Sequence, residues 1–143
     1  MDLEILKKKN LVKSIKQFIA EGKPFLGICL GLQILFEESE ENPGVKGLSL
    51  FKGKVVKFKK GKVPQIGWNK IIPKRKDVFK DGYVYFVNSY YVIPKDKSIV
   101  ATLTDYYGDF VSAIQCNNIT AMQFHPEKSG QFGIGILKRW LKC

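Results

Sequence analysis

The feature that most constrains the fold is a short apolar run that lies between two segments with helical patterning. Residues 25–29 (Phe-Leu-Gly-Ile-Cys) have no polar face, which is typical of a strand covered on both sides. Before this run, apolar residues recur at nearly helical spacing over residues 2–20, with Asp2 as a candidate N-cap and Gly22 as a stop. After it, we expect a second helix over residues 31–40. The order helix, strand, helix predicts an α/β domain.

The remainder of the chain, from about residue 48, has a different pattern. Short runs rich in β-branched and aromatic residues alternate with turn residues, which predicts strands joined by tight connections. The predicted strands are residues 55–58, 70–72, 83–92, 99–104, 110–116 and 120–124, and residues 132–141 form a final predicted helix. A length of 143 residues suits one domain. We therefore expect a single α/β domain over residues 1–143, with a mixed sheet flanked by helices.

The chain carries a formal charge of +11, from 24 basic and 13 acidic residues. A basic excess of this size fits a solvated surface, an anionic partner or a nucleic-acid-binding module. The lysines are scattered and accompany no nucleic-acid-binding motif, so we expect no nucleic-acid partner. No apolar run reaches the roughly 18 residues of a membrane span, and the acidic N-terminus differs from a secretory signal. We therefore expect a cytoplasmic protein without a membrane partner.

Cys29 occupies an unusual position, with Gly27 and Gly31 two residues to either side at the predicted strand-to-helix turn. This arrangement is typical of a nucleophile elbow, in which a tight turn exposes the reactive side chain at a helix N-terminus. Backbone N–H groups there favour a thiolate and can receive an oxyanion. The alternative is a buried cysteine between two packing glycines. The three dispersed cysteines and the single histidine predict neither a disulfide framework nor a structural metal site.

The only histidine in the chain, His125, is the candidate for the base that a thiol nucleophile needs. Pro126 favours an extended backbone at His125, and residues two apart in an extended segment point the same way. The Glu127 carboxylate can then hold one ring nitrogen and leave the other for the Cys29 thiol, as in a catalytic triad. A solvent-facing His-Pro-Glu turn is the alternative for this segment taken alone. Joined to the cysteine elbow, the segment favours nucleophilic catalysis.

Four motifs, taken in order, resemble one enzyme family. Residues 22–33 resemble the nucleophile region of triad-type, class I glutamine amidotransferases, and residues 123–129 resemble the segment that supplies their histidine and glutamate. Residues 64–69 and 85–91 are similar to motifs of the glutaminase subunit of imidazole glycerol phosphate synthase. The resemblance runs from about residue 3 to the C-terminal helix. It implies a flavodoxin-like mixed sheet flanked by helices, and it implies no cofactor.

The resemblance also implies a reaction, in which Cys29 attacks the side-chain amide of glutamine, ammonia leaves, and water hydrolyses the thioester to glutamate. His125 would act as general base and then as general acid, and Glu127 would orient it. The backbone N–H of Leu30 would supply an oxyanion donor. By the same likeness, the glutamine site would be lined by Leu30, Gly31, Gln33, Ser89 and Tyr90.

A partner protein is a further implication of this resemblance. Ammonia would pass to a (β/α)8-barrel cyclase for imidazole glycerol phosphate formation in histidine biosynthesis. Trp68 and Asn69 would face that partner, with plain core packing as the alternative for Trp68. A glutaminase that serves another synthase, and an inactive remnant that keeps only the partner surface, are alternatives for the whole chain.

The chain departs from the family pattern at its beginning. The family usually starts upstream with a strand, a helix and a Pro-Gly-Val-Gly loop that can supply a second oxyanion donor, so we expect N-terminal strands beside residues 25–29 to be missing. Loss of an oxyanion donor typically lowers the rate about 100- to 1000-fold. We therefore expect weak or absent glutaminase activity from this chain alone, unless a partner or a separate piece fills the gap. Gln65 and Asn88 stand where many family members carry histidine.

Overall fold

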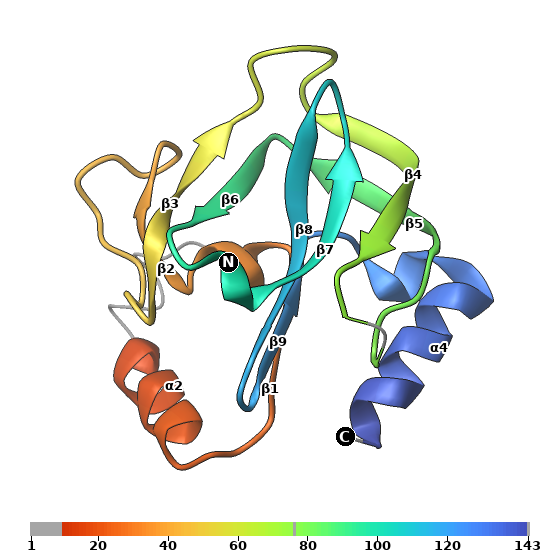
Figure 1. Ribbon diagram of the computed structural model, residues 1–143. Helices are drawn as coiled ribbons and strands as arrows, with labels where there is room; N and C mark the ends of the chain where they lie inside the picture. The colour runs from red at the N-terminus through yellow and green to blue at the C-terminus, as the bar shows by residue number, and fades with distance from the viewer. Residues whose placement is uncertain (1–9, 76, 143) are drawn as a thin grey trace.

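The computed structural model describes residues 10–75 and 77–142, whose strands form one mixed nine-stranded sheet (Figure 1). The elements are α2 (Leu11–Ala20), β1 (Phe25–Ile28), α3 (Leu30–Gln33), β2 (Phe36–Ser39), β3 (Phe51–Lys57), β4 (Gln65–Pro73), β5 (Gly82–Asn88), β6 (Tyr90–Pro94), η1 (Lys97–Ile99), β7 (Val100–Asp105), β8 (Asp109–Cys116), β9 (Ile119–Met122), η2 (Pro126–Lys128) and α4 (Gly130–Leu141). Helices α2 and α4 lie at opposite sides of the sheet in Figure 1.

The strand order is β2-β3-β6-β8-β7-β4-β5, with β9 paired to β8 and β1 paired to β9. Among the described strands, the pairs β1–β9 and β2–β3 are parallel and the other pairs are antiparallel. A parallel pair requires a long crossover connection, and the chain between β1 and β9 supplies it by building most of the sheet. The predicted fold class, a mixed sheet flanked by helices, is confirmed.

Two apolar clusters fill the interior, and they draw on alternate residues of the same strands. Val100 belongs to one cluster and Ala101 to the other, and the same holds for Ala121 and Met122. Alternate side chains of a strand lie on opposite faces of the sheet, so the two clusters cover its two faces. The predicted strand over residues 25–29 is present as β1 and contacts both clusters, but it is only partly covered: Gly27 is buried, whereas Phe25, Leu26 and Ile28 are half-buried.

The predicted helix over residues 31–40 is wrong beyond Gln33. The chain instead enters β2, whose partner is β3 in a parallel register that sets Phe36 opposite Phe51. Phe36 is buried while Glu38 two residues later is exposed, because β2 lies near the surface at the end of the sheet. The Glu37 carboxylate accepts a hydrogen bond from the backbone N–H of Gly53 (3.3 Å). Glu37 and Glu38 therefore lie on a strand and do not oppose a helix dipole. Glu40 likewise accepts a hydrogen bond from the backbone N–H of Lys57 in β3 (3.4 Å).

Several other predicted elements differ in extent. The predicted strands over residues 55–58 and 70–72 are the longer strands β3 and β4. The predicted strand over residues 83–92 is two strands, β5 and β6, separated at Ser89. The first predicted helix is present as α2, and it stops as expected at Gly22, which has φ +81°. The predicted N-cap, Asp2, lies outside the described residues.

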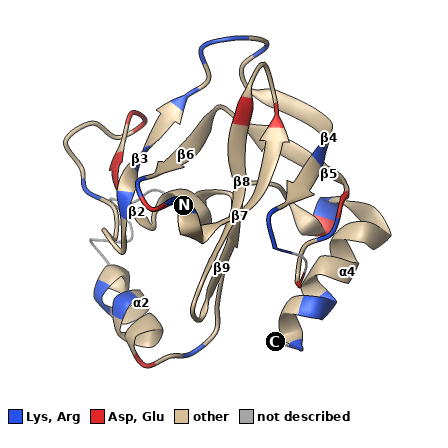
Figure 2. Cartoon of the chain, in the orientation of Figure 1, with Lys and Arg blue, Asp and Glu red and all other residues tan. Residues whose placement is uncertain are grey.

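The basic side chains are distributed over several elements, including α2, α4 and the loop between β3 and β4 (Figure 2). This distribution fits the interpretation of the charge as a solvated surface. Within residues 10–75 and 77–142, no helix is both long and apolar enough to cross a membrane.

Candidate active site

Cys29 lies between the end of β1 and the start of α3, with φ 57° and ψ −107°. A positive φ is rare for a residue other than glycine and costs backbone strain, which fits the predicted nucleophile elbow. A Cβ atom at Gly27 would lie 2.5 Å from the carbonyl oxygen of Gly31, so the turn closes only with glycine there. A Cβ at Gly31 would meet nothing within 4 Å. Close packing therefore explains the first glycine of the motif and not the second.

Pairing of β1 with β9 brings the two halves of the predicted triad to one edge of the sheet. Ile28 is in register with Met122, and the Cys29 N–H donates to the Met122 carbonyl (2.8 Å). The carboxyl ends of adjacent parallel strands meet at the same edge, which is where open α/β sheets bind ligands. Cys29 comes directly after β1, and His125 comes three residues after β9, so both lie at this edge of the sheet.

Glu127 holds the imidazole ring of His125. The distance from Nδ1 to the nearer carboxylate oxygen is 3.1 Å, and the side chains are 22% and 47% exposed. His125 has the extended backbone that Pro126 predicts, with φ −100° and ψ 98°. The next residues do not continue the strand, however, because the 3-10 turn η2 carries Glu127 back toward the ring. Contact with Nδ1 leaves Nε2 as the nitrogen that can face a thiol.

Ser129 fixes the position of this histidine, a role that was not assigned to it from the sequence. Its hydroxyl is buried, accepts a hydrogen bond from the backbone N–H of Tyr85 (2.9 Å) and donates to the carbonyl of His125 (2.5 Å). The N–H of His125 in turn donates to the Tyr85 carbonyl (3.0 Å). These bonds attach the histidine segment to β5. Only the position of Ser129 just before the predicted helix hinted at a hydrogen-bonding role.

Several groups act in opposite directions on the pKa of the Cys29 thiol. Burial is the largest effect and raises the pKa above its usual value, because a thiolate is poorly solvated there. The backbone N–H of Leu30 lowers the pKa, as expected of a donor placed to receive an oxyanion, and the Gln123 amide lowers it too. The negative charges of Glu127 and Glu41 raise it. The net shift of the pKa is upward, so burial and the two carboxylates outweigh the two hydrogen-bond donors.

The residues predicted to line the glutamine site lie around α3. Leu30 and Gly31 are its first two residues, and Gln33 is its last. The Gln33 Nε2 donates to the carbonyl of Tyr90 (3.4 Å), which brings the start of β6 against α3. Ser89 lies beside Tyr90 at the break between β5 and β6.

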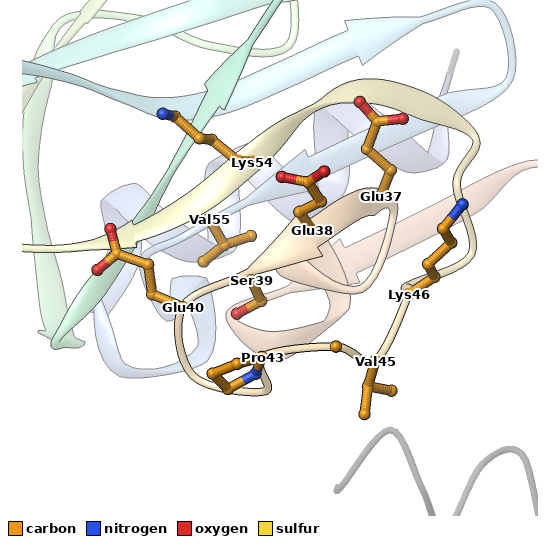
Figure 3. A pocket seen from close by; sticks show the side chains of 10 residues that line it. Glu37, Glu38, Ser39, Glu40, Pro43, Val45, Lys46, Lys54 and Val55 are labelled. Atoms are coloured by element: carbon orange, nitrogen blue, oxygen red, sulfur yellow. The ribbon is translucent and has the colours of Figure 1, made fainter.

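A cavity borders the same short helix. Its walls include Leu30 and Gln33 at one end and Glu41 at the other. It adjoins a more open cavity of about 590 Å³ over β2 and the loop that follows, where Glu37, Glu38 and Glu40 project from the chain (Figure 3). Neither cavity is lined by Cys29 or His125. Glu41 is an exposed residue that lines the cavity at α3, and its charge also acts on the Cys29 thiol.

The two residues predicted to face a partner lie on opposite faces of β4. Trp68 is 57% exposed, and its ring meets that of Tyr85 edge-on, with 5.9 Å between centroids. The Asn69 amide donates to Gln65 and to the carbonyl of Asp105 (2.9 Å each). Trp68 therefore belongs to the outward face, while Asn69 does not.

Among residues 10–75 and 77–142, no group of three or more His, Cys, Asp or Glu side chains is arranged to hold a metal ion. The chemistry at this edge of the sheet is that of a thiol, an imidazole and a carboxylate.

The family model of class-I glutamine amidotransferases matches residues 6–142. Two solved structures share the fold, although each is less than one quarter identical in sequence. A glutamine amidotransferase has a TM-score of 0.73 at 15% identity, over 97% of this chain and 70% of its own. A glutamine amidotransferase from Thermotoga maritima has a TM-score of 0.66 at 20% identity, over 99% of this chain and 57% of its own. The chain belongs to the class-I glutamine amidotransferase family.

Curated relatives narrow this class to one kind of subunit. The imidazole glycerol phosphate synthase subunit HisH of Pyrococcus furiosus is 53% identical over 85% of this chain and 66% of its own length. The HisH subunits of Aquifex aeolicus and Thermotoga maritima are 48% and 42% identical, over 94% and 96% of this chain and 68% of each relative. The resemblance drawn from the four motifs is confirmed. The chain spans about two thirds of the length of these relatives.

Proposed function

We propose that this chain binds glutamine beside Cys29 and hydrolyses its side-chain amide to glutamate and ammonia. The observation that carries the proposal is the meeting of two parallel strand ends, one followed by a strained cysteine and the other by a histidine that a carboxylate holds at 3.1 Å. The similarity to HisH subunits supports the same reaction class.

In the proposed reaction, His125 takes the proton of the Cys29 thiol through Nε2 while Glu127 stabilises the imidazolium through Nδ1. The sulfur forms a bond to the amide carbon of glutamine, and the carbonyl oxygen becomes an oxyanion that the Leu30 N–H receives. His125 then protonates the leaving nitrogen, and ammonia departs as the carbon–nitrogen bond breaks. Finally, His125 removes a proton from water, which attacks the thioester and releases glutamate and the thiol.

We propose that a partner protein accepts the ammonia, and we infer that it is a (β/α)8-barrel cyclase of histidine biosynthesis. The outward face of β4 and β5 supports a protein interface. Ile66, Trp68 and Ile72 alternate along β4 and are each more than half exposed, and Tyr83 is similarly exposed on β5. Exposed aromatic side chains grouped on a rigid sheet are typical of interface cores. The free thiols of Cys29 and Cys116 support a location in the cytoplasm.

The test treats the full chain with a diazoketone analogue of glutamine and identifies the labelled peptide by mass spectrometry. We expect Cys29 to be labelled, and we expect His125→Ala to abolish the labelling because no base then activates the thiol. Free glutamine should protect Cys29 while leaving Cys116 unaffected. Equal labelling of Cys29 and Cys116, without protection by glutamine, would contradict the proposal and favour an inactive remnant.

A second experiment separates the proposed partner from the partner of another synthase. The chain is mixed with the partner subunit of imidazole glycerol phosphate synthase from Aquifex aeolicus, and complex formation is followed by size-exclusion chromatography. A stable complex in which glutamine hydrolysis is faster than in either protein alone supports the assignment. Failure to form a complex, with Cys29 still labelled and protected, would point to a glutaminase that serves another synthase.

A further inference from the structure

One buried polar side chain contacts the proposed nucleophile directly without belonging to the triad. Gln123 is fully buried just beyond the end of β9, and its Nε2 lies 3.5 Å from the Sγ of Cys29. The backbone N–H of Gln123 already donates to the carbonyl of Ser112 (2.8 Å), so the strand does not depend on the side-chain amide. Burial of an amide is costly unless hydrogen bonds offset the loss of solvation. The side chain therefore needs an explanation in terms of its contacts.

We propose that Gln123 is a positioning residue whose amide donates a hydrogen bond to the Cys29 sulfur, and that a relay of side-chain amides fixes the direction of this bond. The proposal rests on the glutaminase function proposed above, because it takes Cys29 as the nucleophile.

The direction of the bond follows from the carbonyl of Tyr90, which can only accept. The Gln33 Nε2 group donates to this carbonyl (3.4 Å) and to the Gln123 Oε1 (3.1 Å). With its oxygen held by Gln33, the Gln123 side chain turns its NH2 group toward Cys29. A donor at this position stabilises the thiolate more than the thiol, because ionised sulfur is the stronger acceptor.

The same carbonyl anchors a second arm of the relay, made of three further amides. Asn88 donates to the Tyr90 carbonyl (3.1 Å) and accepts from Gln65 (3.1 Å). Gln65 accepts from Asn69 (2.9 Å), which also donates to the carbonyl of Asp105 (2.9 Å). Asn88 and Asn69 thus have their oxygen and nitrogen assigned by a backbone carbonyl, and Gln65 has them assigned by these two neighbours. The two arms meet at the Tyr90 carbonyl, with Asn69 of β4 at the far end of one arm and Cys29 at the far end of the other.

The test measures the pH dependence of Cys29 alkylation by iodoacetamide, peptide by peptide, with Cys116 as an internal reference. Gln123→Met keeps the length of the side chain and removes its donor. We expect the midpoint of Cys29 labelling to rise by a few tenths of a pH unit, which is about a twofold loss of rate at neutral pH. Gln33→Met frees the Gln123 amide to rotate, and we expect a smaller loss in the same direction. The double variant should be no slower than Gln123→Met, because both changes act through one hydrogen bond.

Gln115→Met is the matched control, because Gln115 is an amide on β8 that takes no part in the relay, and its profile should equal that of the unaltered chain. A Gln123→Met chain that keeps its circular dichroism spectrum and an unshifted profile would overturn the proposal. If Gln123→Met does not fold, an unshifted profile for Gln33→Met overturns it instead. If His125→Ala also leaves labelling of Cys29 by the glutamine analogue unchanged, the proposed function fails as well. If His125→Ala abolishes that labelling but Gln123→Met and Gln33→Met leave the pH profile unshifted, only the relay proposal fails.

Discussion

At the scale of single residues, the reactivity of Cys29 depends on a balance between burial and a few nearby groups. Burial and two carboxylates disfavour the thiolate, whereas the Leu30 N–H and the Gln123 amide favour it. In the proposed reaction a protonated His125 would change this balance, because a cation beside the sulfur favours its ionised form. The thiol is therefore suited to ionise during the reaction and to remain protonated before it.

Replacement of Glu41 by glutamine should make Cys29 more reactive. The Glu41 charge raises the pKa of the thiol, so its removal lowers that pKa and increases the thiolate fraction at neutral pH. We expect iodoacetamide to label Cys29 about two to three times faster in Glu41→Gln, as the rate profile moves to lower pH. Glu40→Gln is the control, since Glu40 instead accepts a hydrogen bond from the Lys57 N–H (3.4 Å). Slower labelling in Glu41→Gln would contradict the sign of this effect.

The raised pKa of Cys29 also predicts how folding stability depends on pH. The folded chain keeps the thiol proton at pH values where the unfolded chain releases it, so the unfolded state binds fewer protons. The resulting stability is fully present below the ordinary thiol pKa of 9.0 and is lost as the pH rises through the higher folded value. Urea denaturation of the unaltered chain and of Cys29→Ser should therefore show a difference that changes only at alkaline pH. A difference that is constant from neutral to alkaline pH would count against a raised pKa.

At the scale of elements, the turn between β1 and α3 requires glycine at position 27, whereas position 31 has room for a larger side chain. In Gly27→Ala the new Cβ would lie 2.5 Å from the Gly31 carbonyl oxygen and 3.1 Å from the Ala121 Cβ. Overpacking of this kind typically costs about 1–3 kcal/mol. Gly31→Ala meets no atom within 4 Å and should change the free energy of unfolding by less than about 1 kcal/mol, in the stabilising direction. Urea denaturation of the two variants checks this contrast, and equal losses would contradict it.

Sequence patterns over a few neighbouring residues correctly predicted those elements that such short segments determine. The strand β1, the helix stop at Gly22 and the tight turn at Cys29 all follow from a few neighbouring residues. The segment from Phe36 to Ser39 was predicted as helix because its strand character comes from pairing with β3, which no local pattern records. The β1–β9 pairing places Cys29 and His125 after neighbouring strands, and their proposed contact rests on chemistry and resemblance. The amide relay could not be predicted, since its members come from segments that only the folded sheet brings together.

At the scale of the whole molecule, β4 and β5 carry four exposed large apolar side chains, which are Ile66, Trp68, Ile72 and Tyr83. The outward face of β4 and β5 carries Trp68 packed against Tyr85, and the β5 strand also receives the N–H of His125. The proposed partner surface and the candidate active site therefore share β5. Among the described residues, the basic side chains lie on several elements, including α2, α4 and the loop between β3 and β4 (Figure 2).

Truncation of Trp68 should weaken binding of the partner protein and leave Cys29 labelling unchanged. A large exposed aromatic ring that becomes buried in an interface typically contributes about 2 kcal/mol or more, which corresponds to about a 30-fold loss of affinity in Trp68→Ala. Isothermal titration calorimetry with the partner protein measures this loss. Leu141→Ala is the control, because Leu141 is 73% exposed at the end of α4, away from this face. Equal affinities for the unaltered chain and Trp68→Ala would exclude β4 from the interface.

The one-sided pairing of β1 has a consequence for isotope exchange with solvent. Among the described strands β1 pairs with β9 alone, and the N–H groups of Phe25 and Cys29 point toward that strand (2.8 Å each). By the alternation of a strand, the amides of Leu26 and Ile28 point to the other side. Amide hydrogens of β1 should therefore exchange with deuterium at alternating rates, quickly at Leu26 and Ile28 and slowly at Gly27 and Cys29. A chain segment that pairs with this edge of β1 would slow exchange at the amides of Leu26 and Ile28. NMR would measure this change for each residue.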